Sequence, residues 1–227
     1  MSQKFKDKIG GSISVIVLTI YFIIIVYPLI WMILGSLKTT NEIFTNIWGL
    51  PKAWQFENYL VAWNSGIAKF FFNSVYVTAA TVILTLTCAS LYAYSMAIHY
   101  FRFKWLLIGL TVLGLLFSPI VSLIPLYQEI QALGLYDKRE ALILIYTAYQ
   151  IPMSFFLIYD YFRHIDHDYL DAARIDGCSD LRALVSVYVP MSLPIIITSA
   201  VLAGFYAWNE FSLSLILVKN DALRTIP

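Results

Sequence analysis

The segment Asp171–Pro190 reads DAARIDGCSDLRALVSVYVP and differs sharply from its surroundings. It begins with acidic and polar residues, has a glycine at position 177, and is enclosed by long apolar runs. Glycine is typical of the end of a helix, and the Ser-Asp pair that follows is typical of the start of another. The segment therefore predicts a compact polar loop, and the character of the runs around it decides the fold class.

The composition of the 227-residue chain is that of a membrane protein. Hydrophobic residues make up 60% of it and charged residues only 13%, whereas soluble domains carry about a quarter charged residues. A helix needs roughly 20 apolar residues to cross a hydrocarbon core about 30 Å thick. Uncharged runs of this length predict five helical spans, near residues 12–36, 70–98, 105–127, 141–160 and 190–218. The predicted fold is therefore an all-α membrane protein, since helices satisfy their own backbone groups in lipid.

The order of the segments predicts a simple organisation. Residues 1–11 form a cytoplasmic tail, residues 12–218 a transmembrane domain with a polar loop at 161–189, and residues 219–227 a short outer segment. Lys4, Lys6 and Lys8 precede the first span and favour a cytoplasmic N-terminus, which also places the loop inside. The other basic residues divide almost evenly between the two sides. Pro119 and Pro125 predict that the third span is kinked or broken near its outer end.

The first half of the loop predicts a helix with a face suited to contact. Helical spacing places four residues on that face: Tyr169, Ala172, Ala173 and Asp176. The two alanines are expected to let another surface approach closely. Gly177 fits the helix C-terminus, where a left-handed backbone conformation is easiest for glycine.

The second half of the loop predicts another helix, which Ser179 and Asp180 begin. Its apolar stripe has the spacing i, i+3, i+4 and i+7. The residues of the stripe are Leu181, Leu184, Val185 and Tyr188. Pro190 suits the first turn of the fifth span. On these features alone, an amphipathic connector lying on the membrane surface is an alternative interpretation.

The pattern Asp171-Ala172-Ala173, Asp176-Gly177 and Pro190 resembles the cytoplasmic loop by which permease subunits of binding-protein-dependent ABC importers dock onto their ATPase. Further short motifs stand in the order found in sugar-importer permeases of the maltose type. They are Tyr27-Pro28, Ser36–Thr39, Glu57–Tyr59, Asn73-Ser74, Ile124–Tyr127, Leu133–Leu135 and Trp208–Phe211. The chain departs from the family at Asp171, where glutamate is usual, and at Asp166, where proline is common. The second departure predicts a less sharply started loop helix.

The resemblance implies a type I ABC importer permease fold and a subunit without chemistry or cofactor of its own. Its partners would be a second permease subunit, two ATPase subunits and an extracytoplasmic substrate-binding protein, in a bacterial or archaeal inner membrane. The family usually has six spans, so a sixth would be missing after the truncated segment 219–227. The residues expected in the ATPase-coupling loop are Asp171, Ala172, Ala173, Asp176, Gly177, Leu181, Leu184 and Pro190. Those expected along the solute path are Asn73, Tyr206, Trp208, Asn209 and Glu210.

Glu210 is the one clearly intramembrane carboxylate, and such a residue is a functional hypothesis by default. The alternative is that it reaches the outer interface. Permeases for other small solutes, or an ion-coupled secondary transporter, are rival functions, although a single carboxylate makes a poor ion relay. The net charge of +1 gives no indication of nucleic-acid binding, and no G-x-x-x-x-G-K phosphate-binding loop occurs.

Overall fold

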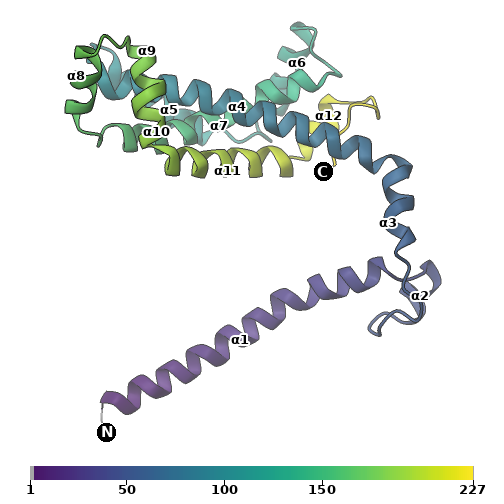
Figure 1. Cartoon of the computed structure of the whole chain (residues 1–227). Helices are drawn as coiled ribbons and strands as arrows, with labels where there is room; N and C mark the ends of the chain where they lie inside the picture. The colour runs from purple at the N-terminus through teal and green to yellow at the C-terminus, as the bar shows by residue number, and fades with distance from the viewer. Residues whose placement is uncertain (1–2, 227) are drawn as a thin grey trace. The chain divides into compact units, whose positions relative to one another are not determined.

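The computed structural model describes residues 3–226, with side chains from Ser14 onward. Within that range every regular element is helical (Figure 1). The chain divides into two compact units, Met1–Gly66 and Ile67–Pro227.

The first unit is dominated by α1 (Gln3–Ser36), which confirms the first predicted span as a helix. The helix begins at Gln3, inside the segment 1–11 that was predicted to be a cytoplasmic tail, and the location of that segment stays a prediction. The side chains of Lys4, Lys6 and Lys8 lie outside the described residues. The stretch Ser14–Ser36 is long and apolar enough to cross a membrane, and none of its most apolar window is buried within the protein.

Two short helices follow in this unit, α2 (Thr40–Thr45) and α3 (Glu57–Ala62). The loop around α2 folds back on the end of α1. The indole Nε1 of Trp31 donates to the Ile47 carbonyl at 3.0 Å, and the buried Lys38 ammonium donates to the Asn46 carbonyl at 2.6 Å. A buried lysine is tolerated here because carbonyl oxygens replace its water.

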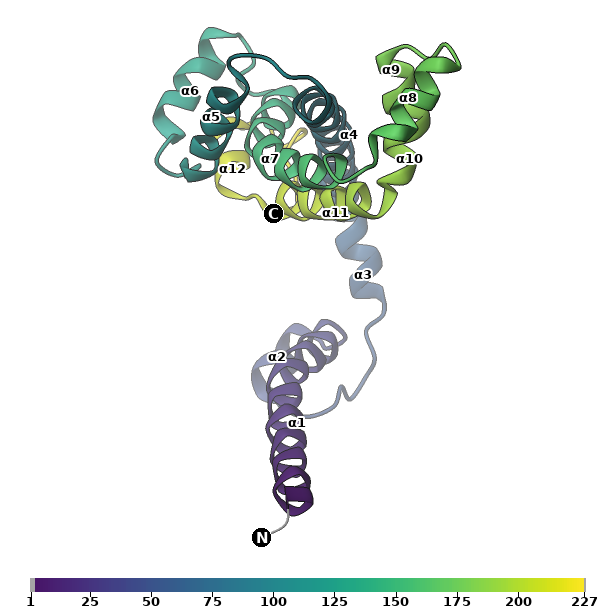
Figure 2. The same ribbon diagram turned by 90° about the vertical axis from the view of Figure 1, so that its left-hand side faces the viewer.

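The second unit is a helical bundle built on α4 (Ala68–Ile98), α7 (Arg139–Phe162) and α11 (Leu193–Asn209) (Figures 1 and 2). The five-residue π-helical turn η1 (Trp63–Ile67) leads into α4, and α5 (Lys104–Leu116) packs against α7. We call the end where α4 and α7 finish and α11 begins the loop end, because residues 163–192 connect the helices there. The other end is the opposite end.

Small buried side chains let the three main helices approach closely. On α11 they are Ser199, Ala203 and Ala207, spaced by four residues. The corresponding stripe on α4 is Val77, Thr81, Thr85, Ala89 and Ala93. Small residues at this spacing are a common means of helix packing in membranes, where lipid supplies no hydrophobic drive between helices. The predicted spans 70–98 and 141–160 are confirmed by α4 and α7.

The predicted third span is not one helix. The helix α5 stops at Leu116, residues 117–122 are irregular, and α6 (Leu123–Ala132) resumes the helix. The predicted break is thus confirmed, with Pro119 in the irregular stretch and Pro125 in the first turn of α6. With 13 residues, α5 is about 20 Å long, shorter than a hydrocarbon core.

The predicted fifth span is divided as well. The second loop helix runs to Met191 and meets α11 at a bend of 86°. The expectation that Pro190 opens span five is wrong, because Pro194 stands in the first turn of α11 instead. Pro194 lacks the N–H that would bond to the carbonyl four residues earlier, so a continuous helix is interrupted between the two prolines. At the other end α11 stops at Asn209, and α12 (Ser212–Leu217) follows.

By length and composition, three described helices can cross a membrane, or four if the bent pair counts as one span. The five predicted spans correspond to these three helices, the bent pair and the shorter α5, so fewer full-length helices are present than predicted spans. The difference arises at positions 105–127 and 190–218, where uncharged sequence is continuous but the helix is not.

Candidate functional site

The polar loop is a pair of helices set beside the bundle at its loop end (Figure 2). The first is α8 (His167–Ile175); the second runs through α9 (Asp180–Ala183), the π-helical turn η2 (Leu184–Tyr188) and α10 (Val189–Met191). Asp166 caps α8, and its carboxylate accepts the Asp168 N–H at 3.2 Å. The expected weak start of this helix is therefore wrong, because aspartate is itself among the best N-cap residues.

The turn between the helices depends on Gly177, which has φ = 78° as predicted. The Gly177 N–H donates to the Arg174 carbonyl at 3.0 Å, and the Cys178 N–H donates to the Ala173 carbonyl at 2.9 Å. These two hydrogen bonds form a Schellman motif, which satisfies carbonyl groups at the end of a helix. Ser179 then caps α9 by accepting the Arg182 N–H at 3.4 Å. A Cβ at Gly177 would meet no other atom within 4 Å, so only backbone strain opposes a larger residue there.

The predicted contact face of α8 is only partly correct. Tyr169, Ala172 and Asp176 are exposed, but Ala173 is buried in the apolar cluster that joins the loop to the bundle. Ala173 therefore faces inward, and its small side chain lets α8 approach the second loop helix. The exposed contact face holds one alanine rather than two.

The predicted apolar stripe of the second loop helix is also divided. Leu184 and Tyr188 are fully buried, whereas Leu181 and Val185 are exposed. Leu181 and Val185 line a surface hollow of about 300 Å³ against the side of α4. The helix thus shows two apolar faces, one directed into the protein and one along its surface.

The charges of the loop fall into two groups. The exposed Asp176 carboxylate has no ion pair or hydrogen bond among the described side chains, and Asp171 lies 3.9 Å from Arg174. Arg174 also contacts Asp180 at 3.3 Å, and the other oxygen of Asp180 lies 3.6 Å from Nε2 of His99. From the sequence, Asp180 was predicted only to begin a helix, and these contacts were not predicted.

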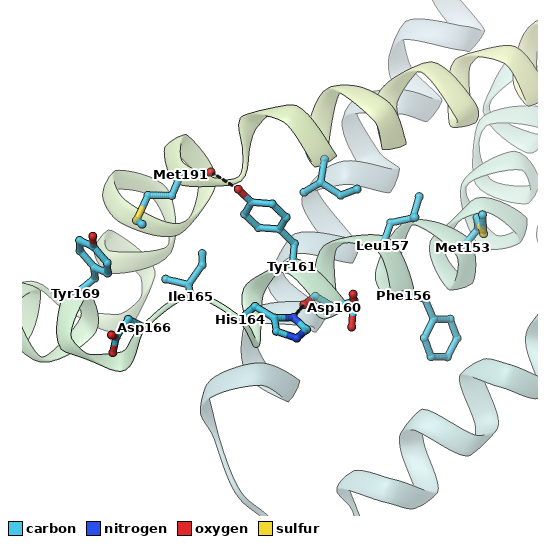
Figure 3. A pocket seen from close by; sticks show the side chains of 11 residues that line it. Met153, Phe156, Leu157, Asp160, Tyr161, His164, Ile165, Asp166, Tyr169 and Met191 are labelled. Carbon is cyan, nitrogen blue, oxygen red and sulfur yellow. Dashed lines mark hydrogen bonds between the residues drawn. The ribbon is translucent and has the colours of Figure 1, made fainter. Parts of the chain in front are cut away.

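A larger hollow of about 840 Å³ opens on another side of the loop, between the last turns of α7, α8 and the start of α11 (Figure 3). The Tyr161 hydroxyl donates to the Met191 carbonyl at 3.1 Å and so ties α7 to the bend before α11. Apolar side chains form most of the wall, and Asp160, His164 and Asp166 add polar groups. This hollow was not predicted from the sequence.

Four of the residues predicted for the solute path lie near the opposite end of α11. Glu210 stands at the break before α12, and its Oε2 accepts the Leu213 N–H at 2.9 Å and the Tyr146 hydroxyl at 3.3 Å. The Tyr206 ring meets the Tyr146 ring edge-on at 5.9 Å. The structure thus brings Tyr206 and Glu210 together around a tyrosine that was not predicted.

The other two residues from α11 have separate contacts. The Asn209 side chain donates back to the Phe205 carbonyl at 2.7 Å. The Trp208 ring packs edge-on against Phe71 of α4, with ring centroids 5.8 Å apart. Both interactions position side chains at this end of the bundle.

Asn73 is buried and holds the C-terminal segment against α4. Its amide donates to the carbonyls of Ala222 at 3.0 Å and Arg224 at 2.9 Å, and its oxygen accepts a hydrogen bond from Arg139 at 3.0 Å. The neighbouring Ser74 hydroxyl accepts the Ile226 N–H at 2.8 Å. All polar atoms of the Asn73 side chain are therefore used within the chain, and a role in solute contact stays a prediction.

Comparisons with known proteins agree with this architecture. A family model described as "Binding-protein-dependent transport system inner membrane component" matches residues 1–226. A probable ABC transporter permease, YurM of Bacillus subtilis (strain 168), is 42% identical over 98% of this chain and 76% of its own length. The diacetylchitobiose uptake permease NgcG of Streptomyces coelicolor is 35% identical over 93% of this chain and 70% of its own length.

One solved structure gives the same fold. It is that of a bacterial ABC transporter involved in the import of the acidic polysaccharide alginate, with a TM-score of 0.86. The alignment covers 98% of this chain and 78% of the matched chain, at 24% sequence identity. The predicted permease fold is therefore confirmed.

Proposed function

The chain belongs to the family of inner membrane components of binding-protein-dependent transport systems, and from this premise we propose that it forms half of the translocation path of an ABC importer for a sugar or oligosaccharide. A second permease subunit completes the path, and an extracytoplasmic binding protein delivers the solute. Two separate ATPase subunits hydrolyse ATP, so this subunit has no catalytic residues.

The observation that supports the coupling role is the structure of the loop. Three local devices fix its shape: the Asp166 cap, the Gly177 turn and the Ser179 cap. Such a rigid pair of helices can transmit a displacement, whereas a mobile connector cannot. Asp171, Ala172 and Asp176 are exposed on it, and the carboxylates of the two aspartates suit basic groups of an ATPase groove. The loop then lies on the cytoplasmic side, and the opposite end faces outward.

The solute class rests on the relatives. Their names specify uptake of diacetylchitobiose, and transport of sulfoquinovosyl glycerol and of multiple sugars. In this chain the aromatic and polar group at the outer part of α11 offers ring faces and hydrogen-bonding groups of the kind that bind sugars. Its members are Tyr206, Trp208, Asn209 and Glu210, and Asn73 fixes the neighbouring segment.

Reconstitution of the complex tests this function. The tagged chain is purified from its host with its bound subunits, placed in proteoliposomes, and offered a panel of radiolabelled di- and trisaccharides with the binding protein present. Uptake is expected only when hydrolysable ATP reaches the ATPase subunits, and a non-hydrolysable analogue is the control. Uptake by this chain alone, without ATP, would refute the proposal.

A further inference from the structure

Among the described side chains, the ion pairs that connect different elements converge on one residue. Five pairs are present, and three of them join residues three positions apart, as in Arg163–Asp160. The remaining two connect different elements, and both end on Asp180. No other carboxylate among the described residues forms an ion pair that links one element to another.

The geometry gives each oxygen of Asp180 its own partner. One oxygen lies 3.3 Å from the Arg174 guanidinium on α8, and the other lies 3.6 Å from Nε2 of His99. His99 is the residue at which α4 ends. Asp180 itself opens α9, directly after the Ser179 cap. A single carboxylate therefore joins both loop helices to the end of a bundle helix.

The Arg174–Asp180 pair closes over the Gly177 turn. Arg174 lies before the glycine and Asp180 after it, and nothing stands within 4 Å of a Cβ built at Gly177. The Schellman hydrogen bonds and the buried apolar cluster between the two loop helices hold the turn from within. The Arg174–Asp180 ion pair adds a charged contact that spans the turn at the surface.

Below the pair, the contact between loop and bundle is aromatic and apolar. The rings of Tyr94 on α4 and Tyr188 on the second loop helix meet edge-on at 5.0 Å, and Tyr94 also faces the His99 ring at 6.4 Å. The hydroxyl groups of both tyrosines are buried without a hydrogen-bond partner. These ring contacts hold the loop against α4, and the Asp180 contacts add a polar constraint on its direction at the surface.

We propose that Asp180 is the positioning residue that fastens the coupling loop to the end of α4, so that a push on the loop moves α4 instead of bending the Gly177 turn. The proposal rests on the proposed function, because the push is attributed to the ATPase subunits. It also gives the carboxylates different tasks: Asp180 contacts this chain, and Asp176 is left exposed for the ATPase subunit. Because the pairs are half exposed, removal of the carboxylate should shift the population of fastened loops only about 1.5- to 5-fold.

Pulsed electron paramagnetic resonance can measure the fastening directly. Both native cysteines, Cys88 and Cys178, are replaced by serine, and spin labels are placed at Tyr100→Cys beside His99 and at His167→Cys on α8. The full chain is first studied alone in lipid nanodiscs. Asp180→Asn is expected to broaden the distribution of distances between the labels, whereas Asp180→Glu should restore a narrow one. Asp168→Asn, which removes an exposed loop carboxylate without an ion pair, is the matched control and should leave the distribution unchanged.

The same labels are then followed in the assembled importer with and without MgATP and vanadate. Without a substitution at Asp180 the distance should stay constant, since loop and α4 move together; with Asp180→Asn it should change when ATP is trapped. His99→Gln should reproduce part of this effect and add little to Asp180→Asn, because both remove the same contact. A distribution in nanodiscs that is unaltered by Asp180→Asn would overturn the fastening. Failure of ATPase subunits to bind the unaltered chain would instead refute the proposed function, with the nanodisc result still deciding the role of Asp180.

Discussion

The two ends of the bundle use polar side chains in opposite ways. At the loop end, Asp171 on α8 and Asp176 at its C-terminus are exposed, and Asp180 is the one described loop carboxylate that forms an ion pair with a bundle helix end. At the opposite end, Asn73 and Asp137 accept or donate hydrogen bonds to the backbone of the C-terminal segment. The first end thus has exposed charges, which the proposed function assigns to the ATPase subunits, whereas the second uses its polar groups to fix its own shape. A surface that must dock and a surface that must hold its geometry have different requirements.

The strongest test of this comparison uses two glycines with the same backbone constraint. Gly177 and Gly134 have φ of 78° and 67°, and a Cβ would meet no atom within 4 Å at either. Valine at each position should cost roughly 1–2 kcal/mol of backbone strain. Gly177→Val is expected to abolish ATP-coupled uptake or binding of the ATPase subunits, with membrane insertion intact, because the turn lies in the coupling loop.

Gly134→Val is the matched control for that experiment. It should lower thermal stability by a similar amount and leave co-purification of the ATPase subunits unchanged. The measurement is co-purification of the ATPase subunits with each of the two variants. Equal loss in both would mean that strain anywhere in the bundle destroys coupling, and the two ends would not differ in function.

Charge reversal sharpens the same comparison at the exposed carboxylates. Asp171→Lys and Asp176→Lys should each weaken binding of the ATPase subunits by tenfold or more, on the order of 1.4 kcal/mol, since like charges would then face each other. Binding of the extracytoplasmic protein should not change, because that surface lies across the bilayer. Affinity can be measured by titrating purified ATPase subunits onto the chain in nanodiscs, with Asp168→Lys as the control for net charge. Normal affinity in both variants would mean that the loop docks without its carboxylates.

Asp137 tests the claim that the opposite end holds its own geometry. It is the one described residue other than glycine with positive φ, at 61°, and its carboxylate accepts the N–H groups of Lys219 and Asn220 at 2.8 Å each. Asp137→Ala should lose about 1–3 kcal/mol of stability, because two backbone donors lose their acceptor. Asp137→Asn should retain most of the stability, since asparagine keeps an oxygen and tolerates this backbone region. Thermal unfolding in detergent gives both values, and equal values for Ala and Asn would contradict the assignment.

The features of the loop that depend on neighbouring residues could be predicted from the sequence. The features that depend on packing between distant parts of the chain could not. The Gly177 turn and the Ser179 cap depend on neighbouring residues, so their pattern was sufficient. The direction of Ala173 depends on where the second loop helix lies, and periodicity carries no such information. The contact between His99 and Asp180 joins distant parts of the chain, and neither residue has a neighbour in sequence that indicates it.

The helix boundaries show the same division. An uncharged run predicts a length that can span a membrane, and it predicted α4 and α7 well. It does not report where the backbone leaves a helix. Prolines predicted the break in the span 105–127, whereas the bend before Leu193 and the stop at Asn209 were absent from the predicted span 190–218. Prolines indicate where a helix is interrupted, and the prediction of the fifth span did not take Pro194 into account.

The substitution Glu210→Gln has the smallest expected effect on stability, and it distinguishes two explanations of the Glu210 carboxylate. Its oxygen accepts the Leu213 N–H and the Tyr146 hydroxyl, so the structure needs an acceptor there and not a charge. Glu210→Gln keeps an acceptor oxygen and should change stability by no more than about 0.5 kcal/mol, whereas Glu210→Ala should lose about 1–3 kcal/mol. Uptake rates measured beside these stabilities then distinguish the roles. If Glu210→Gln transports sugar normally, the residue holds the break between α11 and α12. If the glutamine variant is stable but inactive, the negative charge itself serves the solute path, and the opposite end would share with the loop end a carboxylate kept for something outside the chain.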